Sequence, residues 1–478
     1  MVVTVPSVVM VAGSLLLAWL FHRFLTWSSH RHRRRSDVML PPGSFGLPLL
    51  GETLQYFSSS SSMELTPFFK QRLERYGPVF KTNLVGMDLI VSLDPEINTD
   101  VLQQEGKAFD IWFPDSFKRF LGDENIASSA GAVHKLMRNM VIRIFGPENL
   151  RVMLLSDVQR AVNRSLASWL EKPSIELKTA ASSMICSVTA MWLMGYGTSI
   201  SSGELWKFYD VRGVLSFPLN IPGTAFHRCM QGRKHVLKVL KQLLDGRRNI
   251  EPRENNKDLL DLMVQELNKE EPLLNEKTVL NLLFVLLFGS FEATSSAITV
   301  ALKFLTDNPK ALQELTEEHE QIMKRRTNPN SEITWEEYKS MKFTSCVIHE
   351  SIRLANIAPV LFRKAKQDVH IKGIFPIKIT SYTIPEGWIV MVCPAAAHQN
   401  PITYKDPTVF NPWRWKDISE PVGGSKDFLA FGYGLRYCAG AYFAKLQMAI
   451  FLHYLVTKYR WKVISGDVVL SPALRFPN

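Results

Sequence analysis

The chain has 478 residues, of which 46% are hydrophobic and 21% are charged, an ordinary globular composition that allows a large buried core. Its cysteines form no Cys-x-x-Cys pair and no dense framework, which argues against a disulfide scaffold or a zinc ribbon and favours a reducing compartment; they are residues 186, 229, 346, 393 and 438. Lysine and arginine exceed the acidic residues by 11, and part of this excess is local.

The N-terminal segment predicts a membrane anchor. Residues 2–21 carry no charge and are long enough to cross a bilayer core of about 30 Å as a helix, and Trp19 and Trp27 suit the membrane interface. The run HRHRRR at 30–35 could by itself indicate nucleic-acid binding, but its place directly after an apolar segment favours a cytosolic flank. Residues 36–478 should then lie in the cytosol. A cleaved signal peptide is the alternative, which the long apolar stretch and the position of the charge disfavour.

A proline-rich stretch should separate this anchor from the rest of the chain. Residues 40–52 contain Pro41, Pro42 and Pro48 with three glycines, which predicts a stiff, non-helical hinge. No long linker follows it. We therefore predict an anchor over 1–28, a basic and proline-rich hinge over 29–52, and one large domain over 53–478.

Most signals beyond the hinge are helical. Residues 78–93 carry β-rich runs around Gly86 and predict a hairpin. Residues 278–305 are almost uninterrupted apolar sequence between a capping Asn275 and Pro309, which predicts a helix roughly 45 Å long. Residues 334–337 fit a capping box, and 341–354 predict another helix. The pattern indicates a mainly α fold with small β-sheets.

Two polar motifs stand out against this background. Glu350 and Arg353 lie three residues apart on one face of the predicted helix 341–354, where they can pair, although a solvated ion pair is the usual explanation for this spacing. The second motif, FGYGLRYCAG at 431–440, places Cys438 on a glycine-rich loop between an apolar run and a helix.

The composition of this loop suits a bound metal. Its glycines at 432, 434 and 440 allow close backbone approach and positive φ. Arg436 offers a fork for a carboxylate, and Phe431 offers a flat apolar cover. Such a loop can hold a thiolate against a metal, whereas a cysteine without this context would be a buried free thiol.

The complete pattern F-x-x-G-x-R-x-C-x-G resembles the haem-binding loop of the cytochrome P450 family. The resemblance implies the cytochrome P450 fold behind an N-terminal transmembrane helix, with haem b as cofactor. It further implies that the Cys438 thiolate is the axial iron ligand, supported by cofactor-binding residues Phe431, Gly434, Arg436 and Gly440.

The same resemblance gives roles to more distant residues. Glu350 and Arg353 with Arg414, from the segment NPWRW at 411–415, would form a buried triad that fixes the loop under the haem. His134 and Arg138 match the spacing of the family's W-x-x-x-R helix, with histidine in the tryptophan position, and would bind the haem propionates beside Arg436. Arg363 is a weaker candidate for that role. The alternative for His134 and Arg138 is a solvated basic helix face.

The long helix carries FGSFEAT at 288–294, which resembles the family's oxygen-activation motif. Glu292 falls on the acidic position, and we expect it to be catalytic together with Thr294. Two positions depart from the motif, because Ser290 replaces a glycine and Ala293 replaces the threonine that hydrogen-bonds dioxygen in the family. Thr294 lies one residue after the position of the family's threonine, which places it about 100° further around the helix.

The expected substrate pocket follows only from the resemblance. Segments 109–117, 217–224 and 358–362 resemble the pocket-lining loops of the plant clan that oxidises sterols and triterpenoids, and GSFEATSS resembles subgroup eighty-seven. The implied pocket residues are Ile126, Phe291, Ala358 and Val360. Residues 374–381 look like an eight-residue insertion in a β-hairpin, and the chain ends at 478, where relatives usually continue through one more strand.

These features together imply a monooxygenase that inserts one oxygen atom of dioxygen into a C–H bond of an apolar, sterol- or triterpenoid-like lipid. Its electrons would come from NADPH through a haemoprotein reductase. The single-pass anchor would lie in the endoplasmic reticulum membrane with the catalytic domain in the cytosol, and no nucleic-acid partner is expected. Two alternatives stay open: a haem-thiolate isomerase or dehydratase that needs no external electrons, and a catalytically silent haem protein.

Overall fold

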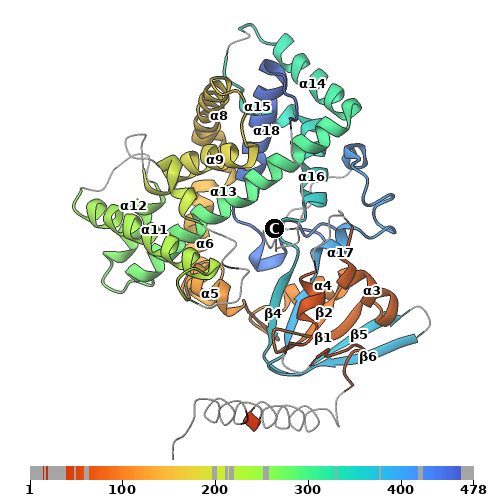
Figure 1. Ribbon diagram of the computed structural model, residues 1–478. Coiled ribbons are helices and arrows are strands. Elements are labelled where there is room, and N and C mark those ends of the chain that lie inside the picture. The colour runs from red at the N-terminus through yellow and green to blue at the C-terminus, as the bar shows by residue number, and fades with distance from the viewer. Residues whose placement is uncertain are drawn as a thin grey trace, which may run out of the picture. The chain divides into compact units, whose positions relative to one another are not determined.

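The computed structural model describes residues 14, 18–19, 39–47, 50–58, 64–195, 202–209, 214, 220–250, 258–328, 331–375, 378–417 and 424–464. The chain divides into two compact units. We call them the sheet unit, from residues 1–58, 66–110 and 360–393, and the helical unit, from residues 59–65, 111–359 and 394–478. Figure 1 shows their elements.

The sheet unit is built on a five-stranded sheet in the order β1-β2-β7-β4-β3. Its strands are β1 (Val79–Leu84), β2 (Met87–Ser92), β3 (Phe109–Ile111), β4 (Leu361–Ala365) and β7 (Ile389–Val392). β1 and β2 form the predicted hairpin with the pair Leu84↔Met87 next to the turn, while β2 and β7 are parallel. The helices of this unit are α2 (Thr53–Tyr56), α3 (Pro67–Tyr76) and α4 (Pro95–Gln103).

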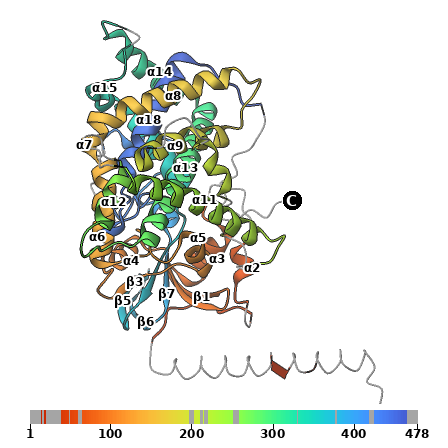
Figure 2. The same ribbon diagram turned by 90° about the vertical axis from the view of Figure 1, so that its left-hand side faces the viewer.

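A second, two-stranded sheet contains the expected insertion. β5 (Val369–Phe375) and β6 (Lys378–Ile384) run antiparallel and side by side in both views (Figures 1 and 2). The register pairs Ile371 with Tyr382 and Phe375 with Lys378, so residues 374–375 and 378–381 lie at the end of the two paired strands. That these residues are an insertion stays a prediction.

Deleting residues 374–381 should preserve or improve haem incorporation. The deletion joins Gly373 to Tyr382 and leaves Lys372 and Gly373 as a two-residue turn on the retained Ile371↔Tyr382 pair, a connection that suits a hairpin with glycine in the loop. The loop-closure cost changes by only about 0.6 kcal/mol per doubling of loop length. Haem content per folded protein is the measurement. If the deletion eliminates folded protein, the segment belongs to the core.

The helical unit holds most of the helices. They are α5 (Asp115–Leu121), α6 (Gly131–Phe145), α7 (Pro147–Asn149), α8 (Leu155–Leu170), α9 (Leu177–Met194), α11 (Ala225–Arg248), α12 (Leu259–Leu267), α13 (Glu276–Asp307), α14 (Pro309–Lys324), α15 (Trp335–Ser340), α16 (Lys342–Ala355), α17 (Pro394–His398) and α18 (Ala441–Lys458). Short turns of π or 3₁₀ helix add η1 (Leu150–Leu154), η2 (Ser202–Phe208), η3 (Pro412–Trp415) and η4 (Gly434–Arg436). The mainly α fold with small sheets is therefore confirmed.

The long helix α13 begins and ends where the sequence predicted. The Asn275 side chain accepts a hydrogen bond of 2.9 Å from the amide of Thr278, and Pro309 opens α14 directly after the helix ends. Among the described residues, α13 alone is long and apolar enough to cross a membrane, and half of its most apolar window is buried within the protein. It packs against α9 and α16 as a core helix (Figure 1). The predicted anchor, residues 2–21, lies outside the described residues except for Ser14, Ala18 and Trp19, which are helical.

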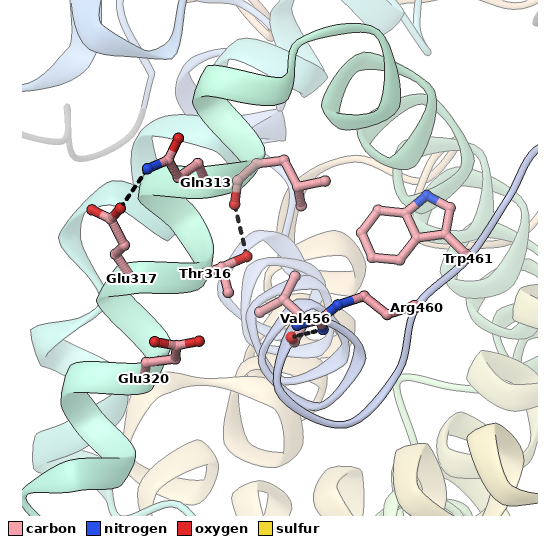
Figure 3. Close-up of a pocket in the computed structure, with 8 residues that line it drawn as sticks. Gln313, Thr316, Glu317, Glu320, Val456, Arg460 and Trp461 are labelled. Carbon is pink, nitrogen blue, oxygen red and sulfur yellow. Dashed lines mark hydrogen bonds between the residues drawn. The ribbon is translucent and has the colours of Figure 1, made fainter.

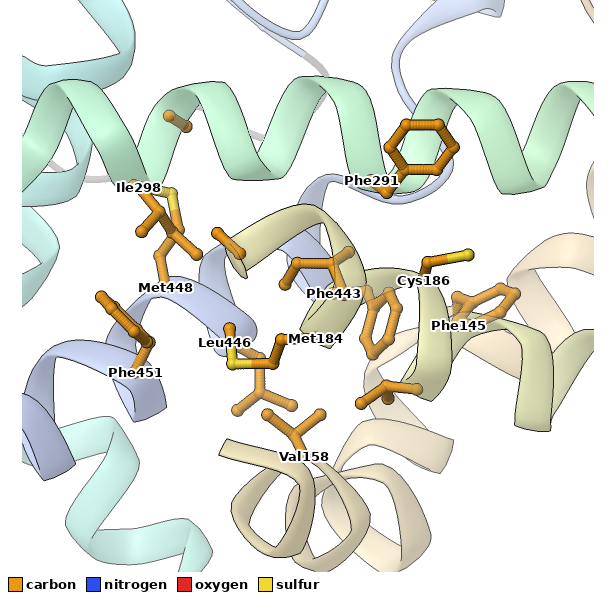
Figure 4. Close-up of a cluster of buried hydrophobic side chains, with 14 of the residues drawn as sticks. Phe145, Val158, Met184, Cys186, Phe291, Ile298, Phe443, Leu446, Met448 and Phe451 are labelled. Carbon is orange, nitrogen blue, oxygen red and sulfur yellow. The ribbon is translucent and has the colours of Figure 1, made fainter. Parts of the chain in front are cut away.

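The core of the helical unit lies where α6, α8, α9, α13 and α18 meet (Figure 4). Phe145, Met184, Phe291 and Phe451 contribute large apolar side chains from four of these helices. The five cysteines are not joined in disulfides in the described part of the chain, and four of them are buried. The exception is Cys438, which is exposed.

A directional chain of hydrogen bonds joins α14, α16 and α18. Glu318 accepts from the Thr344 hydroxyl at 2.5 Å and from the amides of Phe343 and Thr344 in the first turn of α16. Because that hydroxyl donates to Glu318, it accepts from His319 Nε2 at 3.1 Å, which leaves His319 Nδ1 to accept from His453 Nδ1 at 3.0 Å. Both rings are buried, so protonating His319 at Nδ1 would set two N–H donors against each other, and protonating His453 would place a charge in the interior.

This histidine pair should make the protein sensitive to acid. Burial lowers the pKa of His453 to about 3, with Arg326 and Lys458 adding to the effect, and lowers that of His319 well below 6.5. The unfolded chain therefore binds protons that the folded chain excludes, and stability is lost as the pH falls below about 6.5. We expect a single histidine to contribute up to roughly 2 kcal/mol of this loss between pH 6.5 and 5.

The measurement is urea unfolding at several pH values. His453→Gln, which can still donate to His319, should flatten the loss of stability with falling pH, whatever its effect at pH 7. An unchanged slope in this variant would show that the pair does not control acid stability.

Candidate functional site

The loop 431–440 closes tightly before α18. Gly432 and Gly434 have φ of +76° and +63°, a region that favours glycine. Gly440 differs from the expectation of positive φ: its φ is −95°, and it is the N-cap of α18. The amide of Cys438 donates to the Phe431 carbonyl at 2.8 Å. This hydrogen bond and the two glycine turns fix Cys438 at the point where the loop meets the helix.

The Cys438 thiol is accessible to solvent but lies close to other groups of the protein. Its side chain is exposed to solvent, yet surrounding protein atoms desolvate it enough to raise its pKa. A hydrogen bond from the Gly440 backbone and the positive charge of Arg138 act in the opposite direction. A metal-bound thiolate needs an accessible sulfur with a hydrogen-bond donor and a cation beside it. Cys438 has all three, so the residues around it fit a thiolate ligand.

Two of the four predicted propionate partners meet this loop. Arg138, on α6, donates to the Tyr437 carbonyl at 2.6 Å, and its burial lowers its pKa while Cys438 raises it. Arg436 donates to the carbonyls of Ile126 at 2.8 Å and Ser129 at 2.6 Å. The structure therefore joins the loop to α6 and to the segment that precedes it.

The other two propionate candidates are placed differently. His134 is buried on α6, one turn before Arg138. Arg363 is buried on β4 of the sheet unit, where its guanidinium lies 2.9 Å from Glu105. It therefore belongs to a different unit from Arg138 and Arg436.

The structure brings Glu350, Arg353 and Arg414 together. Arg353 donates to both Glu350 oxygens at 2.8 Å, and neither side chain is exposed. Arg414, on η3, donates to Glu350 at 3.1 Å, and the Trp415 indole donates to it at 2.8 Å. Trp415 is the last residue of the segment NPWRW, but the predicted triad did not include it. Glu350 therefore has two cations and an indole N–H as partners in the interior.

His398 links this triad to the cysteine loop, and sequence reasoning missed it. Its carbonyl accepts from Arg353 at 2.6 Å, while its Nε2 accepts from the Leu429 amide at 3.0 Å. The Leu429 carbonyl in turn accepts from the Gly432 amide at 2.9 Å. Burial and Arg353 lower the pKa of His398 to about 3, so the ring is neutral and can accept. Only the fold brings this residue between the motifs.

The residues of the predicted oxygen-activation motif point to different sides of α13. Gly289 is exposed, and Ala293, four residues on, is half-buried on the same face. Thr294 is 4% exposed and lies on the core-facing side, about 100° from Ala293. Glu292 is partly exposed, and the ammonium of Lys178, on α9, lies 2.6 Å from its carboxylate. No sequence signal pointed to Lys178, which is 114 residues away in the chain.

The predicted pocket residues also differ in their surroundings. Phe291 is 2% exposed, with its ring 5.2 Å from that of Tyr209 in an edge-to-face contact. Ile126 packs against the core, and its carbonyl accepts from Arg436. Ala358 is exposed in the helical unit, and Val360 is half-buried in the sheet unit.

A separate pocket of about 320 Å³ contains none of the predicted site residues. It lies between α14 and the end of α18, and its lining includes Glu317 and Glu320 on α14 and Arg460 and Trp461 after α18 (Figure 3). Arg460 donates to the Val456 carbonyl at 3.0 Å, so it closes the end of α18.

Residues 41–475 match the model of the cytochrome P450 family, and the chain belongs to this family. It is therefore a haem-b-dependent oxidoreductase of the monooxygenase class, which uses NADPH and dioxygen. The haem supplies the iron at which dioxygen is reduced.

Individual relatives cover nearly the whole chain. It is 50% identical over 458 residues to cytochrome P450 87A3 of Oryza sativa subsp. japonica, covering 95% of this chain and 87% of that protein. It is 39% identical over 469 residues to cucurbitadienol 11-hydroxylase of Siraitia grosvenorii, covering 97% and 95%. The solved structure of retinoic acid-bound cyanobacterial CYP120A1 superposes with a TM-score of 0.78 at 26% identity, covering 91% of this chain and 97% of that one.

Proposed function

We propose that this protein hydroxylates a sterol or triterpenoid-like lipid, with Cys438 as the thiolate ligand of its haem. The observation that carries the proposal is the exposed Cys438 thiol at the start of α18, with the Gly440 backbone and Arg138 acting on it. The substrate class is supported by similar proteins named cucurbitadienol 11-hydroxylase and beta-amyrin 16-alpha-hydroxylase, each 39% identical to this chain.

The other residues support this chemistry in distinct ways. The triad Glu350, Arg353 and Arg414 stabilises the cysteine loop through His398. The haem propionates are bound by cationic or hydrogen-bonding side chains: His134, Arg138, Arg363 and Arg436. Phe431, Gly434 and Gly440 shape the loop against the cofactor. The substrate lies near Ile126, Phe291, Ala358 and Val360.

Proton delivery in this proposal depends on Glu292. Ala293 carries no hydroxyl at the position where the family has threonine, and the neighbouring Thr294 faces the core. Glu292 is the acidic group of the motif and retains contact with solvent. Its carboxylate gives a proton inward and takes one from water outside, while Thr294 contributes through the packing of α13.

The electron donor is an NADPH-dependent haemoprotein reductase, and the protein is anchored in the endoplasmic reticulum membrane by residues 2–21, with residues 53–478 in the cytosol. Protease added to sealed microsomes should digest this domain completely, because the basic run at 30–35 retains it on the cytosolic side. Protection or glycosylation of residues beyond 52 would reverse the topology.

Product analysis after co-expression with a reductase in yeast that makes sterols and triterpenes tests the function. We expect a product heavier by one oxygen atom, and its formation should require both the reductase and NADPH. Turnover of a lipid hydroperoxide without electrons would instead favour an isomerase or dehydratase. Haem binding with neither activity would identify a silent protein and overturn the proposal.

A further inference from the structure

An ion pair joins α9 to the oxygen-activation segment of α13. Lys178 Nζ lies 2.6 Å from Glu292 Oε1, and the two side chains are 43% and 29% exposed. One turn further along both helices, the Ser182 hydroxyl donates to the Ser295 hydroxyl at 3.0 Å. These two contacts fix how α9 and α13 face each other, with the charged contact at the solvent edge and the neutral one buried.

The first turn of α9 gives Lys178 a fixed backbone. The Glu176 carboxylate caps this helix by accepting from the amides of Lys178 at 3.2 Å and Thr179 at 2.6 Å. The lysine therefore extends from a capped helix end. Holding the ammonium against Glu292 costs mainly side-chain entropy, because the backbone is already ordered.

The position of Glu292 on α13 shows on which side of the helix its carboxylate lies. At about 100° per residue, Glu292 lies about 60° from Ser295, which contacts α9, and about 100° from Ala293. Gly289 and Ala293 occupy the other, more open side of the helix. Lys178 thus holds the carboxylate on the α9 side, at the edge between solvent and the Gly289–Ala293 face.

We propose that Lys178 is a positioning residue that fixes the Glu292 carboxylate where protons enter the protein from solvent. This inference rests on the proposed function, in which Glu292 delivers protons. When Glu292 gives its proton inward, the bare carboxylate is held by the ammonium and takes the next proton from water on the α9 side. The lysine neither gains nor loses a proton in this step; it sets the orientation of the acid.

The test compares Lys178→Met and Lys178→Arg with the parent protein and with Lys303→Met. Lys303 is a matched control, because it forms an ion pair of 3.0 Å with Asp307 on α13 and is 32% exposed. The haem-loaded protein is assayed with reductase and NADPH, with cucurbitadienol as the probe, and hydrogen peroxide released per NADPH is measured. A difference infrared spectrum against Glu292→Gln isolates the carboxylate stretching band of Glu292 without turnover.

We expect Lys178→Met to raise peroxide per NADPH severalfold and to shift the infrared band of Glu292. Lys178→Arg should restore both, and Lys303→Met should change neither. The double variant Lys178→Met/Glu292→Gln should release no more peroxide than Glu292→Gln alone, since the lysine acts through the acid.

Two outcomes distinguish a failure of this inference from a failure of the proposed function on which it rests. If Glu292→Gln raises peroxide release but Lys178→Met behaves like Lys303→Met, the positioning role is wrong and the role of Glu292 stands. If Glu292→Gln matches the parent, proton delivery by Glu292 is wrong, and the role of Lys178 fails with it.

Discussion

Replacing Cys438 with histidine is expected to abolish the absorption band of the reduced carbonyl complex that gives the cytochrome P450 family its name. The band requires a thiolate ligand on the haem iron, and among the five cysteines, all in the described part of the chain, Cys438 is the exposed one. The other four are buried within helices or beside strands. Histidine would still offer a nitrogen ligand, so haem content and the carbonyl spectrum are measured on the same preparation.

Cys346→Ala is the matched control for this experiment. Cys346 is a free thiol on α16, and burial raises its pKa, so it remains a neutral, non-ligating thiol. The control variant should retain the full band. Retention of the band in Cys438→His would exclude Cys438 as the ligand.

Glu350→Ala is expected to cost about 3–5 kcal/mol of unfolding free energy, because it leaves a buried cation without its partner. Arg353 is 1% exposed and keeps the carbonyls of His398 and Pro407 and the ring of Tyr404 but no carboxylate, while Arg414 loses its carboxylate. Urea unfolding followed by circular dichroism measures the loss. Since Arg353 also holds the His398 carbonyl, haem retention should fall together with stability.

Glu314 provides a control with the same chemistry at the surface. It accepts from the Trp413 indole at 2.6 Å and from Lys416 at 2.8 Å, but it is 36% exposed. Glu314→Ala should therefore cost at most about 1 kcal/mol for its ion pair. Equal losses in the two variants would show that burial of the Glu350 triad does not determine its contribution.

The elements that sequence reasoning predicted well are those set by local signals. α13 follows from an apolar run between Asn275 and Pro309, and α15 begins with the capping box that Thr334 and Glu337 predicted. The pairing of Glu350 with Arg353 follows from their spacing on one helix. In each case the residues that make the contact lie within a few positions of each other.

The contacts that sequence reasoning missed depend on the packing of distant segments. Lys178 meets Glu292 across 114 residues, and Arg138 meets the Tyr437 carbonyl across 299. The direction in which Thr294 faces depends on which side of α13 the other helices cover, and the apolar sequence of that helix leaves this undetermined. Motif spacing identified Glu292, Thr294 and Arg138 but not the groups that they contact.

The hydrogen-bonded chain from Glu318 to His453 has a consequence for local opening. Glu318 holds the first turn of α16, which carries Glu350 and Arg353, and His453 lies on α18, which begins just after Cys438. The three helices it joins therefore form one cooperative unit, or foldon. Amide hydrogens of α16 and α18 should exchange with solvent in a single event, so the haem ligand and its supporting triad are lost together rather than in sequence.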